Sequence, residues 1–256
     1  MLKLSNFSFE INGKKILDNI NIELADKCQL TILGPNGSGK STLIKSICGI
    51  NKSWTGELFI QGKNVKEQSQ RDLSKVISYV PQFLEVHADF TVWDFFEMSY
   101  FPHLDNFRSL SLEERERGEE ILESFHLIDL RNRSMMTLSG GERQKVFIAS
   151  SVFQNPKILL LDEPTSYLDP KHQDEVNQLI FNLKSKMNIV LVSHDINSSL
   201  INSERVIGLK NGSIFFDGSP SEVLEKNHLN DLFDKKFNLI KHPNKNIDII
   251  VPEVYS

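Results

Sequence analysis

Hydrophobic and polar residues alternate along the first part of the chain. Residues 2–9 are apolar at nearly every second position, with one slip, and residues 16–24 alternate in the same way. Asn12 and Gly13 lie between the two stretches, and this pair is typical of a tight hairpin turn. The opening of the chain is therefore predicted to form antiparallel sheet.

Later strands have a different pattern, because they are continuous aliphatic runs. These runs lie within residues 28–34, 157–162 and 188–194. Unbroken apolar strands are typical of a parallel sheet that is covered on both faces. Helical patterns separate the runs, so the fold class is predicted to be α/β with a parallel sheet.

Residues 86–137 differ from the rest, since they are charge-rich and helical in pattern and show no strand signal. Ser111 and Glu114 have the spacing of a capping box, and Ser219 and Glu222 repeat it near the end of the chain. We expect a single domain with a core, an inserted helical subdomain and a C-terminal extension. Their predicted bounds are 1–85 with 138–218 for the core, 86–137 for the helical subdomain and 219–256 for the extension.

The composition narrows the function classes. With 39% hydrophobic and 25% charged residues the chain resembles ordinary globular proteins, and its net charge of −5 does not favour a nucleic-acid partner. The two cysteines are too few for a disulfide framework and suit reduced thiols in a cytosolic protein. The start of the chain has no secretory pattern, and the longest apolar run, residues 158–161, is far too short to cross a membrane. A role at a membrane would therefore need a separate membrane-spanning chain.

The strongest motif follows the first continuous strand. Residues 34–41 fit the phosphate-binding pattern G-x-x-x-x-G-K-[ST], between a strand and a helix with an apolar face. Glycines let backbone N–H groups approach phosphate oxygens, and the helix N-terminus adds partial positive charge. We expect Lys40 to reach the β- and γ-phosphates and the Ser41 hydroxyl to ligate Mg²⁺. The residues predicted to hold the nucleotide in this phosphate cradle are Gly34, Pro35, Asn36, Gly37, Ser38, Gly39, Lys40, Ser41 and Thr42.

Two carboxylates end the second continuous strand. Asp162 and Glu163 follow four aliphatic residues, and two charges at a buried strand end need a charged partner. Mg²⁺ suits Asp162, because this ion prefers oxygen ligands. Glu163 would then polarise a water molecule for attack on the γ-phosphate. The two motifs together predict hydrolysis of a nucleoside triphosphate, with a surface acid at a helix start as the alternative for Glu163.

A third motif, LSGGE at residues 138–142, lies between the other two, and with it the sequence resembles the ATP-binding cassette (ABC) ATPases over essentially the whole chain. In that family this signature caps the γ-phosphate held by the cradle of another subunit. The resemblance therefore implies a head-to-tail dimer of two copies with two ATP molecules between them. It also implies the P-loop NTPase fold of ABC ATPases, with an N-terminal antiparallel β-subdomain and an inserted α-helical subdomain. The signature residues expected to contact ATP are Ser139, Gly140, Gly141 and Glu142.

The signature also raises a question of local structure. Ser139 would stand at the positive end of a helix, which in the isolated chain would be an unfilled anion site. On this hypothesis both glycines are present because the phosphate of the other subunit approaches the backbone closely.

Other positions take expected roles from the same resemblance. Gln82 matches the glutamine that contacts Mg²⁺ and the attacking water, and His194 matches the histidine that hydrogen-bonds the γ-phosphate. Asp169 lies in the loop along the dimer seam and is expected to contribute to nucleotide binding. Phe9 matches the aromatic position that stacks on adenine, with an ordinary core phenylalanine as the alternative. The catalytic residues are thus expected to be Glu163, His194 and Gln82, and the Mg²⁺ ligands Ser41, Gln82 and Asp162.

Features outside these motifs resemble the importers of ferric siderophores, haem and cobalamin. His172 and Gln173 match the sequence of that branch at the same place after the seam loop. Residues 90–104 are similar to the segment that lies between the glutamine loop and the helical subdomain in that branch. Two departures occur, because residues 99–100 are Ser-Tyr in place of Gly-Arg and residues 150–151 are Ser-Ser in place of Arg-Ala.

The resemblance implies a peripheral subunit at the cytoplasmic face of the inner membrane. It would hydrolyse ATP to power uptake through two separate transmembrane permease subunits, with a substrate-binding protein as an indirect partner and no nucleic acid. The Gln82 loop and the helical subdomain would pass the motion to permease helices that rest in a groove between the two lobes. The alternatives are the ATPase of a manganese or zinc importer, and a soluble ABC ATPase of iron–sulfur assembly.

Overall fold

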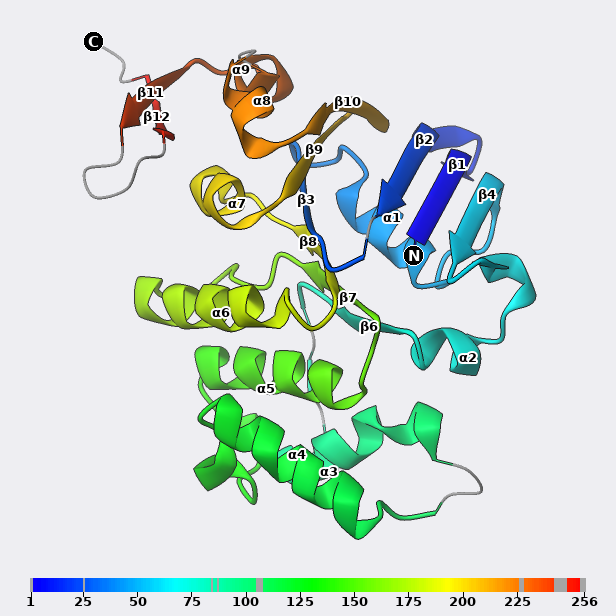
Figure 1. The fold of residues 1–256 in the computed structure, drawn as a ribbon, viewed down its shortest axis with the longest axis vertical. Helices are drawn as coiled ribbons and strands as arrows, with labels where there is room; N and C mark the ends of the chain where they lie inside the picture. The colour runs from blue at the N-terminus through cyan, green and yellow to red at the C-terminus, as the bar shows by residue number, and fades with distance from the viewer. Residues whose placement is uncertain are drawn as a thin grey trace. The chain divides into compact units, whose positions relative to one another are not determined.

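The computed structural model describes residues 2–24, 26–83, 85–86, 88–104, 108–225, 228–241 and 248–253. Its contacts divide the chain into two compact units, one of Met1–Glu67 with Ile189–Ser256 and one of Gln68–Asn188. Figure 1 traces the course of the chain through both. This division by contacts does not test the predicted boundaries of the core, the helical subdomain and the C-terminal extension. Those boundaries stay a prediction.

The first unit opens with the predicted antiparallel sheet. Its strands lie in the order β2-β1-β4-β5, with bounds β1 Leu2–Ile11, β2 Lys14–Leu24, β4 Trp54–Ile60 and β5 Lys63–Asn64. Asn12 and Gly13 have positive φ of 50° and 76°, as the tight turn between β1 and β2 requires. The slip in the alternation of β1 is a break in strand register between Leu4 and Phe7. This irregularity keeps both side chains buried.

The same unit contains the first and third continuous strands. The strand order is β10-β9-β3-β8, with bounds β3 Gln29–Leu33, β8 Asn188–Val192, β9 Arg205–Lys210 and β10 Ser213–Gly218. β3 pairs in parallel with β8 and β9, and every residue of β3 is buried, as its unbroken apolar pattern predicted. Helix α1, Lys40–Ile47, follows β3 and buries Leu43, Ile44 and Ile47 on its apolar side.

The end of the chain packs against these strands. Its elements are α7 Ile196–Asn202, α8 Pro220–Glu225, α9 His228–Phe233, β11 Phe237–Lys241 and β12 Asp248–Pro252. The predicted capping box is present, since the backbone N–H of Ser219 donates to Glu222 Oε2 at 2.7 Å. The side chain of Asn197 on α7 exchanges hydrogen bonds of 2.8 and 3.0 Å with the backbone of Ile250 on β12. One apolar cluster joins these parts, formed by Leu33, Leu200, Val206, Phe216, Val223, Leu229, Leu232 and Ile250.

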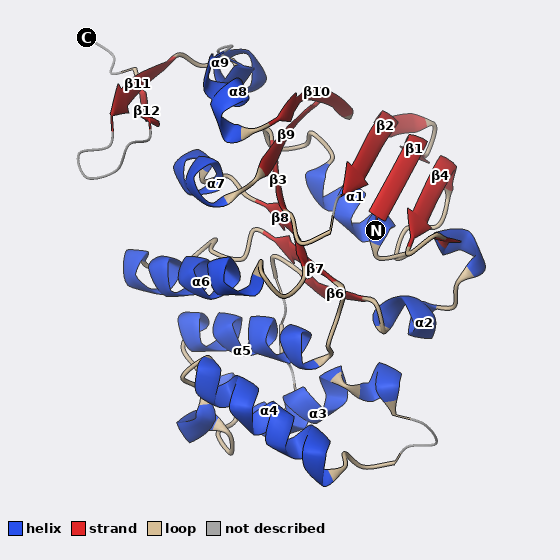
Figure 2. Cartoon of the chain, in the orientation of Figure 1, coloured by secondary structure: helices blue, strands red, loops and turns tan. Residues whose placement is uncertain are grey.

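The second unit combines a parallel strand pair with a group of helices (Figure 2). β6 Ile77–Val80 pairs in parallel with β7 Ile158–Asp162. The helices are α2 Gln70–Ser74, α3 Val92–Ser99, α4 Leu112–Ser124, α5 Gly140–Phe153 and α6 Pro170–Leu183, with short 3₁₀ turns between some of them. α5 packs against α3, α4 and α6. The predicted capping box of α4 is present, because Ser111 and Glu114 each bond the backbone N–H of the other.

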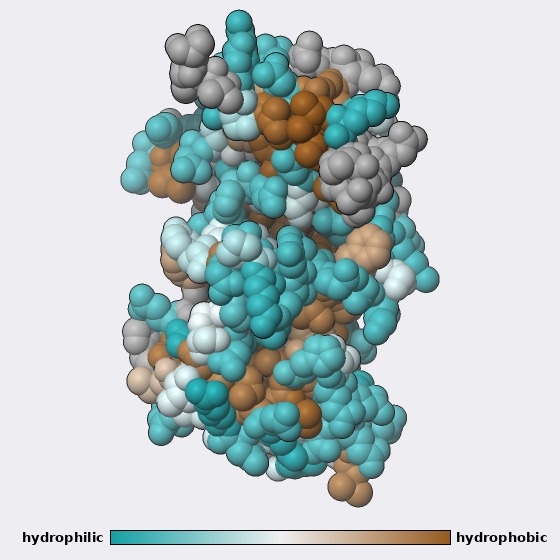
Figure 3. Space-filling view, turned by 90° about the vertical axis from the view of Figure 1, so that its left-hand side faces the viewer, coloured by the Kyte–Doolittle hydropathy of each residue, from teal (hydrophilic) through white to brown (hydrophobic). Residues whose placement is uncertain are grey.

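Within the part of the chain that the structure describes, every helix is too short or too polar to cross a membrane. Hydrophilic side chains cover most of the face drawn in Figure 3, and the hydrophobic areas on that face form separate patches.

Candidate active site

The phosphate cradle connects β3 to α1, and its backbone depends on two glycines. Gly39, the N-cap of α1, has φ of 105°, a conformation that a residue with a Cβ rarely adopts. A Cβ on Gly34 would lie only 2.1 Å from the carbonyl oxygen of Leu209 on β9. The first and last glycines of the motif are therefore required by the close packing of the loop as well as by its predicted ligand.

Hydrogen bonds hold the cradle in place from within and from neighbouring turns. Lys40 is 6% exposed, and its Nζ donates to the carbonyl oxygens of Gly34 and Pro35 at 2.8 and 3.1 Å. The backbone N–H of Gly212 donates to Ser38 O at 3.1 Å. Ser38 Oγ is buried and lacks a hydrogen-bond partner among the described residues. A buried hydroxyl of this kind suits an acceptor such as a phosphate oxygen.

The predicted acids lie at the end of β7. Asp162 is 2% exposed, and the hydroxyl of Tyr79 donates to its Oδ2 at 3.4 Å. Glu163 follows with φ of 49°, outside the strand conformation. Its Oε2 accepts hydrogen bonds from Gln82 Nε2 at 2.7 Å and from Ser166 Oγ at 3.0 Å. The structure thus brings two of the three predicted catalytic residues into direct contact.

The predicted metal ligands fit Mg²⁺ by their chemistry. Ser41 offers a hydroxyl, Asp162 a buried carboxylate, and Gln82 an amide oxygen, because its amide nitrogen is the atom bonded to Glu163. Hard cations such as Mg²⁺ prefer oxygen donors of these three kinds. The assignment of the three ligands stays a prediction.

The signature helix α5 begins differently from the expectation. Ser139 is its N-cap, and Glu142 completes a capping box by accepting from the backbone N–H and the Oγ of Ser139, both at 2.8 Å. These two donors lower the pKa of the Glu142 carboxyl below its ordinary value. The prediction of an unfilled anion site in the isolated chain is therefore wrong, since the chain's own carboxylate occupies the helix N-terminus.

The two glycines of the signature have different surroundings. A Cβ on Gly140 would meet no atom within 4 Å, whereas a Cβ on Gly141 would lie 2.3 Å from Cδ2 of His172. Close approach of a phosphate stays a prediction for both glycines, and at Gly140 the chain itself offers no other steric reason. For Gly141, the ring of His172 in the same chain is a second reason for a glycine, because it leaves no room for a side chain there.

The remaining predicted residues lie in different surroundings. Asp169 is the N-cap of α6 and accepts from the backbone N–H of His172 at 3.1 Å. His194 follows β8 and is exposed. Phe9 is only 6% exposed within β1, so its ring offers little surface to a base, and this burial favours the alternative of a core residue. The roles of Asp169 and His194 stay predictions.

A hollow of about 270 Å³ lies beside the end of β6, between α3 and α5. Both departures from the chelate-importer pattern meet at its wall, since Ser99 Oγ donates to the carbonyl oxygen of Ser150 at 3.0 Å. The hollow is lined by Tyr79, Val80, Pro81, Phe95, Met98, Ser99, Phe147, Ser150, Ser151 and Gln154. Its surface is mainly apolar with serine hydroxyls, and none of the described residues that line it carries a charged side chain.

An exposed aromatic pair beside the catalytic residues was missed at the level of sequence. Phe83 and Tyr167 are 64% and 79% exposed, and their ring centroids lie 5.1 Å apart. Phe83 follows Gln82, a predicted catalytic residue, and Tyr167 follows Ser166, which donates to the Glu163 carboxylate. The two rings together form a small exposed aromatic patch next to Gln82 and Ser166.

Known proteins resemble this chain in sequence and in fold. The sequence profile of the family described as ABC transporter matches residues 17–166. The iron(3+)-hydroxamate import ATP-binding protein FhuC of Bacillus subtilis is 34% identical over 233 residues, which cover 90% of this chain and 87% of that protein.

Solved structures agree with this relationship. A chain of an inward-facing transporter described as a metal-chelate type ABC transporter superposes with a TM-score of 0.85 at 26% identity, covering 99% of this chain and 97% of that one. The ATP-binding cassette MJ0796, in a dimeric structure bound to ADP and phosphate, has a TM-score of 0.74 at 29% identity and covers 86% and 99%. The predicted α/β cassette with an antiparallel β-subdomain and a helical insert is thereby confirmed. From sequence, site geometry and fold together, the chain belongs to the ABC transporter family and is one of its ATP-binding cassettes.

Proposed function

We propose that this cassette hydrolyses ATP to power the import of a metal chelate, with a ferric siderophore, haem or cobalamin as its cargo. The observation that carries the catalytic part is the Glu163 carboxylate, which accepts hydrogen bonds from Gln82 and Ser166 beside the buried Asp162. The cargo is supported by the relatives, since FhuC is named for iron(3+)-hydroxamate import and the transporter structure for a metal chelate.

In this proposal each predicted site residue has a separate role in ATP binding or hydrolysis. Lys40 and the cradle hold the phosphates, because cationic and N–H donors match phosphate oxygens. Glu163 accepts the proton of the attacking water, and the two donors on its Oε2 fix the orientation of its carboxylate. His194 donates a hydrogen bond to the γ-phosphate. Mg²⁺, held by Ser41, Gln82 and Asp162, would neutralise phosphate charge.

Two copies of the chain would join head to tail, so that Ser139 and Gly140 of one copy contact the γ-phosphate on the other. The exposed pair of Phe83 and Tyr167 supports a covered surface beside the catalytic residues. To donate to the phosphate, the Ser139 hydroxyl must first leave Glu142, which accepts from it at 2.8 Å. Dimer formation therefore includes an exchange of acceptors at the signature.

Two transmembrane permease subunits would bind the cassettes at the cytoplasmic face of the membrane, with a substrate-binding protein as an indirect partner. The hollow between α3 and α5 supports this part of the proposal, because its lining is uncharged and mainly apolar. It also adjoins the segment that leads from β6 to Gln82. A permease helix seated there would contact the same segment that positions Glu163.

Uptake experiments test the proposed function directly. Cells with and without the chain are given radiolabelled ferric siderophore, haem or cobalamin, with Mn²⁺ and Zn²⁺ as competing cargoes. Loss of uptake of one chelate on deletion supports the proposal. Loss of Mn²⁺ or Zn²⁺ uptake alone would move the chain to the metal-ion importers. Recovery of the chain with soluble scaffold proteins, and without a polytopic membrane subunit, would favour iron–sulfur assembly.

A further inference from the structure

The histidine and glutamine that follow Asp169 make contacts that the proposed reaction does not use. His172 Nδ1 donates to Asp169 Oδ2 at 2.6 Å, and the backbone N–H of His172 donates to Asp169 Oδ1 at 3.1 Å. Both donors lower the pKa of the Asp169 carboxyl below its ordinary value. The imidazole is therefore fixed in orientation by the carboxylate of the N-cap residue of its own helix.

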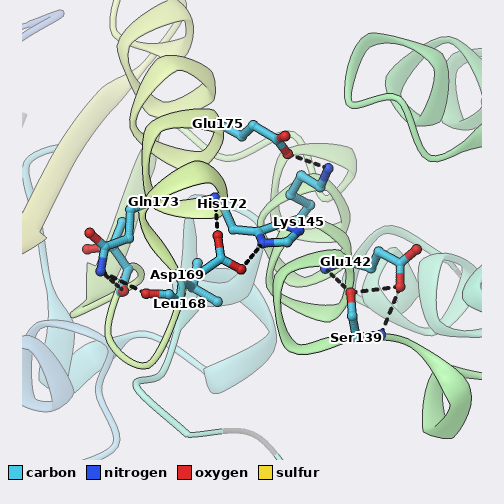
Figure 4. A network of polar contacts seen from close by, with 9 residues as sticks. Ser139, Glu142, Lys145, Leu168, Asp169, His172, Gln173 and Glu175 are labelled. Carbon is cyan, nitrogen blue, oxygen red and sulfur yellow. Dashed lines mark hydrogen bonds and ion pairs between the residues drawn. The ribbon is translucent and has the colours of Figure 1, made fainter.

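Gln173 continues this arrangement toward the catalytic loop. Its Nε2 donates to the carbonyl oxygen of Leu168 at 2.9 Å and lies 3.4 Å from that of Thr165. The loop bonded in this way begins at Glu163 and contains Ser166, which donates to the Glu163 carboxylate. The first turn of α6 is thus hydrogen-bonded to the loop that follows the proposed base, as Figure 4 shows for Gln173 and Leu168.

The other face of the His172 ring meets the signature. A Cβ at Gly141 would lie 2.3, 2.5 and 2.9 Å from the ring atoms Cδ2, Cγ and Nε2. These distances are far shorter than any normal carbon contact, so even the smallest side chain would displace the whole ring. Displacement would break the bond to Asp169, because that bond fixes the imidazole from the opposite direction.

An ion pair one turn further along supports the same contact. Lys145 Nζ on α5 lies 2.9 Å from Glu175 Oε2 on α6, and Lys145 is the main cause that lowers the pKa of the Glu175 carboxyl. Figure 4 shows the ion pair of Lys145 with Glu175 and the bond of the His172 ring to Asp169. The start of α5 is therefore attached to α6 at two points within one chain.

We propose that His172 is a positioning residue that holds the signature and the catalytic loop of one chain in a fixed relation. The proposal rests on the proposed function, in which two copies join head to tail with ATP bound between them. The signature of each chain would contact ATP on the partner copy, whereas Glu163 acts on ATP of its own chain. Through His172, a change at one signature reaches the loop of Glu163, so the ring connects the two ATP sites of the dimer. Gly141 is a glycine because this ring needs its space.

A rescue experiment separates this role from a contact of Gly141 with phosphate. Gly141→Ala should lower kcat for ATP hydrolysis by more than His172→Ala does, because the displaced ring pushes on the signature and on Asp169, whereas removal of the ring only deletes their contacts. Combining it with His172→Ala removes the clash, so Gly141→Ala/His172→Ala should be faster than Gly141→Ala, by about 2-fold to 100-fold as contacting pairs typically show. Alanine is otherwise favourable at this helical position.

Gly140 provides the matched control. A methyl group at Gly140 meets no atom within 4 Å in the chain itself, so Gly140→Ala should be no faster with His172→Ala than without it. Equal kcat of Gly141→Ala and the double variant would overturn the proposal, and so would a rescue of Gly140→Ala. A wild-type chain without ATPase activity, with or without its membrane subunits, would instead overturn the proposed function.

His172→Ala alone gives a second measurement that adds no atoms. It should lower kcat by about threefold or more, within the range for contacting residues, and leave ADP affinity within about twofold, because ADP depends on the cradle of the same chain. The midpoint of thermal unfolding should stay near the wild-type value. An unchanged kcat would contradict a positioning role. A loss of ADP affinity, or a fall in the unfolding midpoint, that matches the loss of kcat would also contradict it. Either result would mean that His172 only stabilises the fold.

Discussion

Replacing Glu163 by Gln removes the proposed proton acceptor and keeps the shape of the side chain. Oε2 of Glu163 accepts from Gln82 Nε2 at 2.7 Å and from Ser166 Oγ at 3.0 Å, and the amide oxygen of a glutamine accepts both bonds as well. The loop should therefore keep its conformation. Loss of a general base typically costs about 10²–10⁴-fold in rate, or roughly 2.7–5.5 kcal/mol in the barrier.

The expected result for Glu163→Gln is a fall in kcat of about 10²–10⁴-fold with ATP binding retained. Phosphate release under saturating ATP measures kcat, and gel filtration with ATP and Mg²⁺ should show a stable dimer, because the phosphate contacts persist. Ser166→Ala is the control, since it keeps the carboxylate and removes one of its two donors; its kcat should fall by no more than about tenfold, the equivalent of one hydrogen bond. A Glu163→Gln variant with kcat within tenfold of the wild type would refute Glu163 as the base.

Three further changes test other parts of the structure. Lys40→Ala removes a charge-assisted phosphate contact, so equilibrium binding of ATP should weaken by at least about tenfold, and a smaller loss would contradict the role of Lys40. Arg117→Met removes a hydrogen bond of 2.7 Å to Phe153 O and a guanidinium 4.7 Å from the Phe153 ring, and urea unfolding should show a loss of about 1–3 kcal/mol. Bonds from Arg108 lower the pKa of Glu114 to about 2. Because a depressed pKa stabilises the fold above the ordinary value of 4.5, that contribution is lost as the pH falls from 4.5 towards 2. Between pH 6 and pH 3 the wild type should lose about 1–2 kcal/mol more than Glu114→Gln, and equal losses would show that the ion pair contributes nothing.

The sequence pattern predicted those turns, strands and helix caps whose structure depends on residues close together in the chain. The hairpin turn at Asn12 and Gly13, the slip in β1 and the buried strands all correspond to features of the structure. The capping box of Ser139 and Glu142 has the same spacing as those recognised at Ser111 and Ser219. That spacing was sufficient to predict the capping box at the start of α5. It was not used, because these residues were expected to contact a phosphate instead.

Contacts between distant positions could not be predicted in this way. Gly141 and His172 are 31 positions apart, and only the packing of α5 against α6 brings the ring over the glycine. The same holds for Ser99 and Ser150, whose departures from the family pattern look unrelated until Ser99 Oγ is found on the carbonyl of Ser150. Phe9 illustrates the reverse case, because the alternation of β1 already placed it on the buried face.

The hydrogen bonds of Lys40 have a consequence for turnover. Its ammonium group has three N–H donors, and two of them already bond carbonyl oxygens of the loop, so a phosphate shares this cation with Gly34 and Pro35. Sharing makes the net gain in affinity smaller than the strength of the new bond. When the nucleotide leaves, the carbonyl oxygens of Gly34 and Pro35 keep the ammonium group bonded and stabilise the nucleotide-free loop. The loop thereby limits how strongly it retains ADP, which an ATPase must release in every cycle.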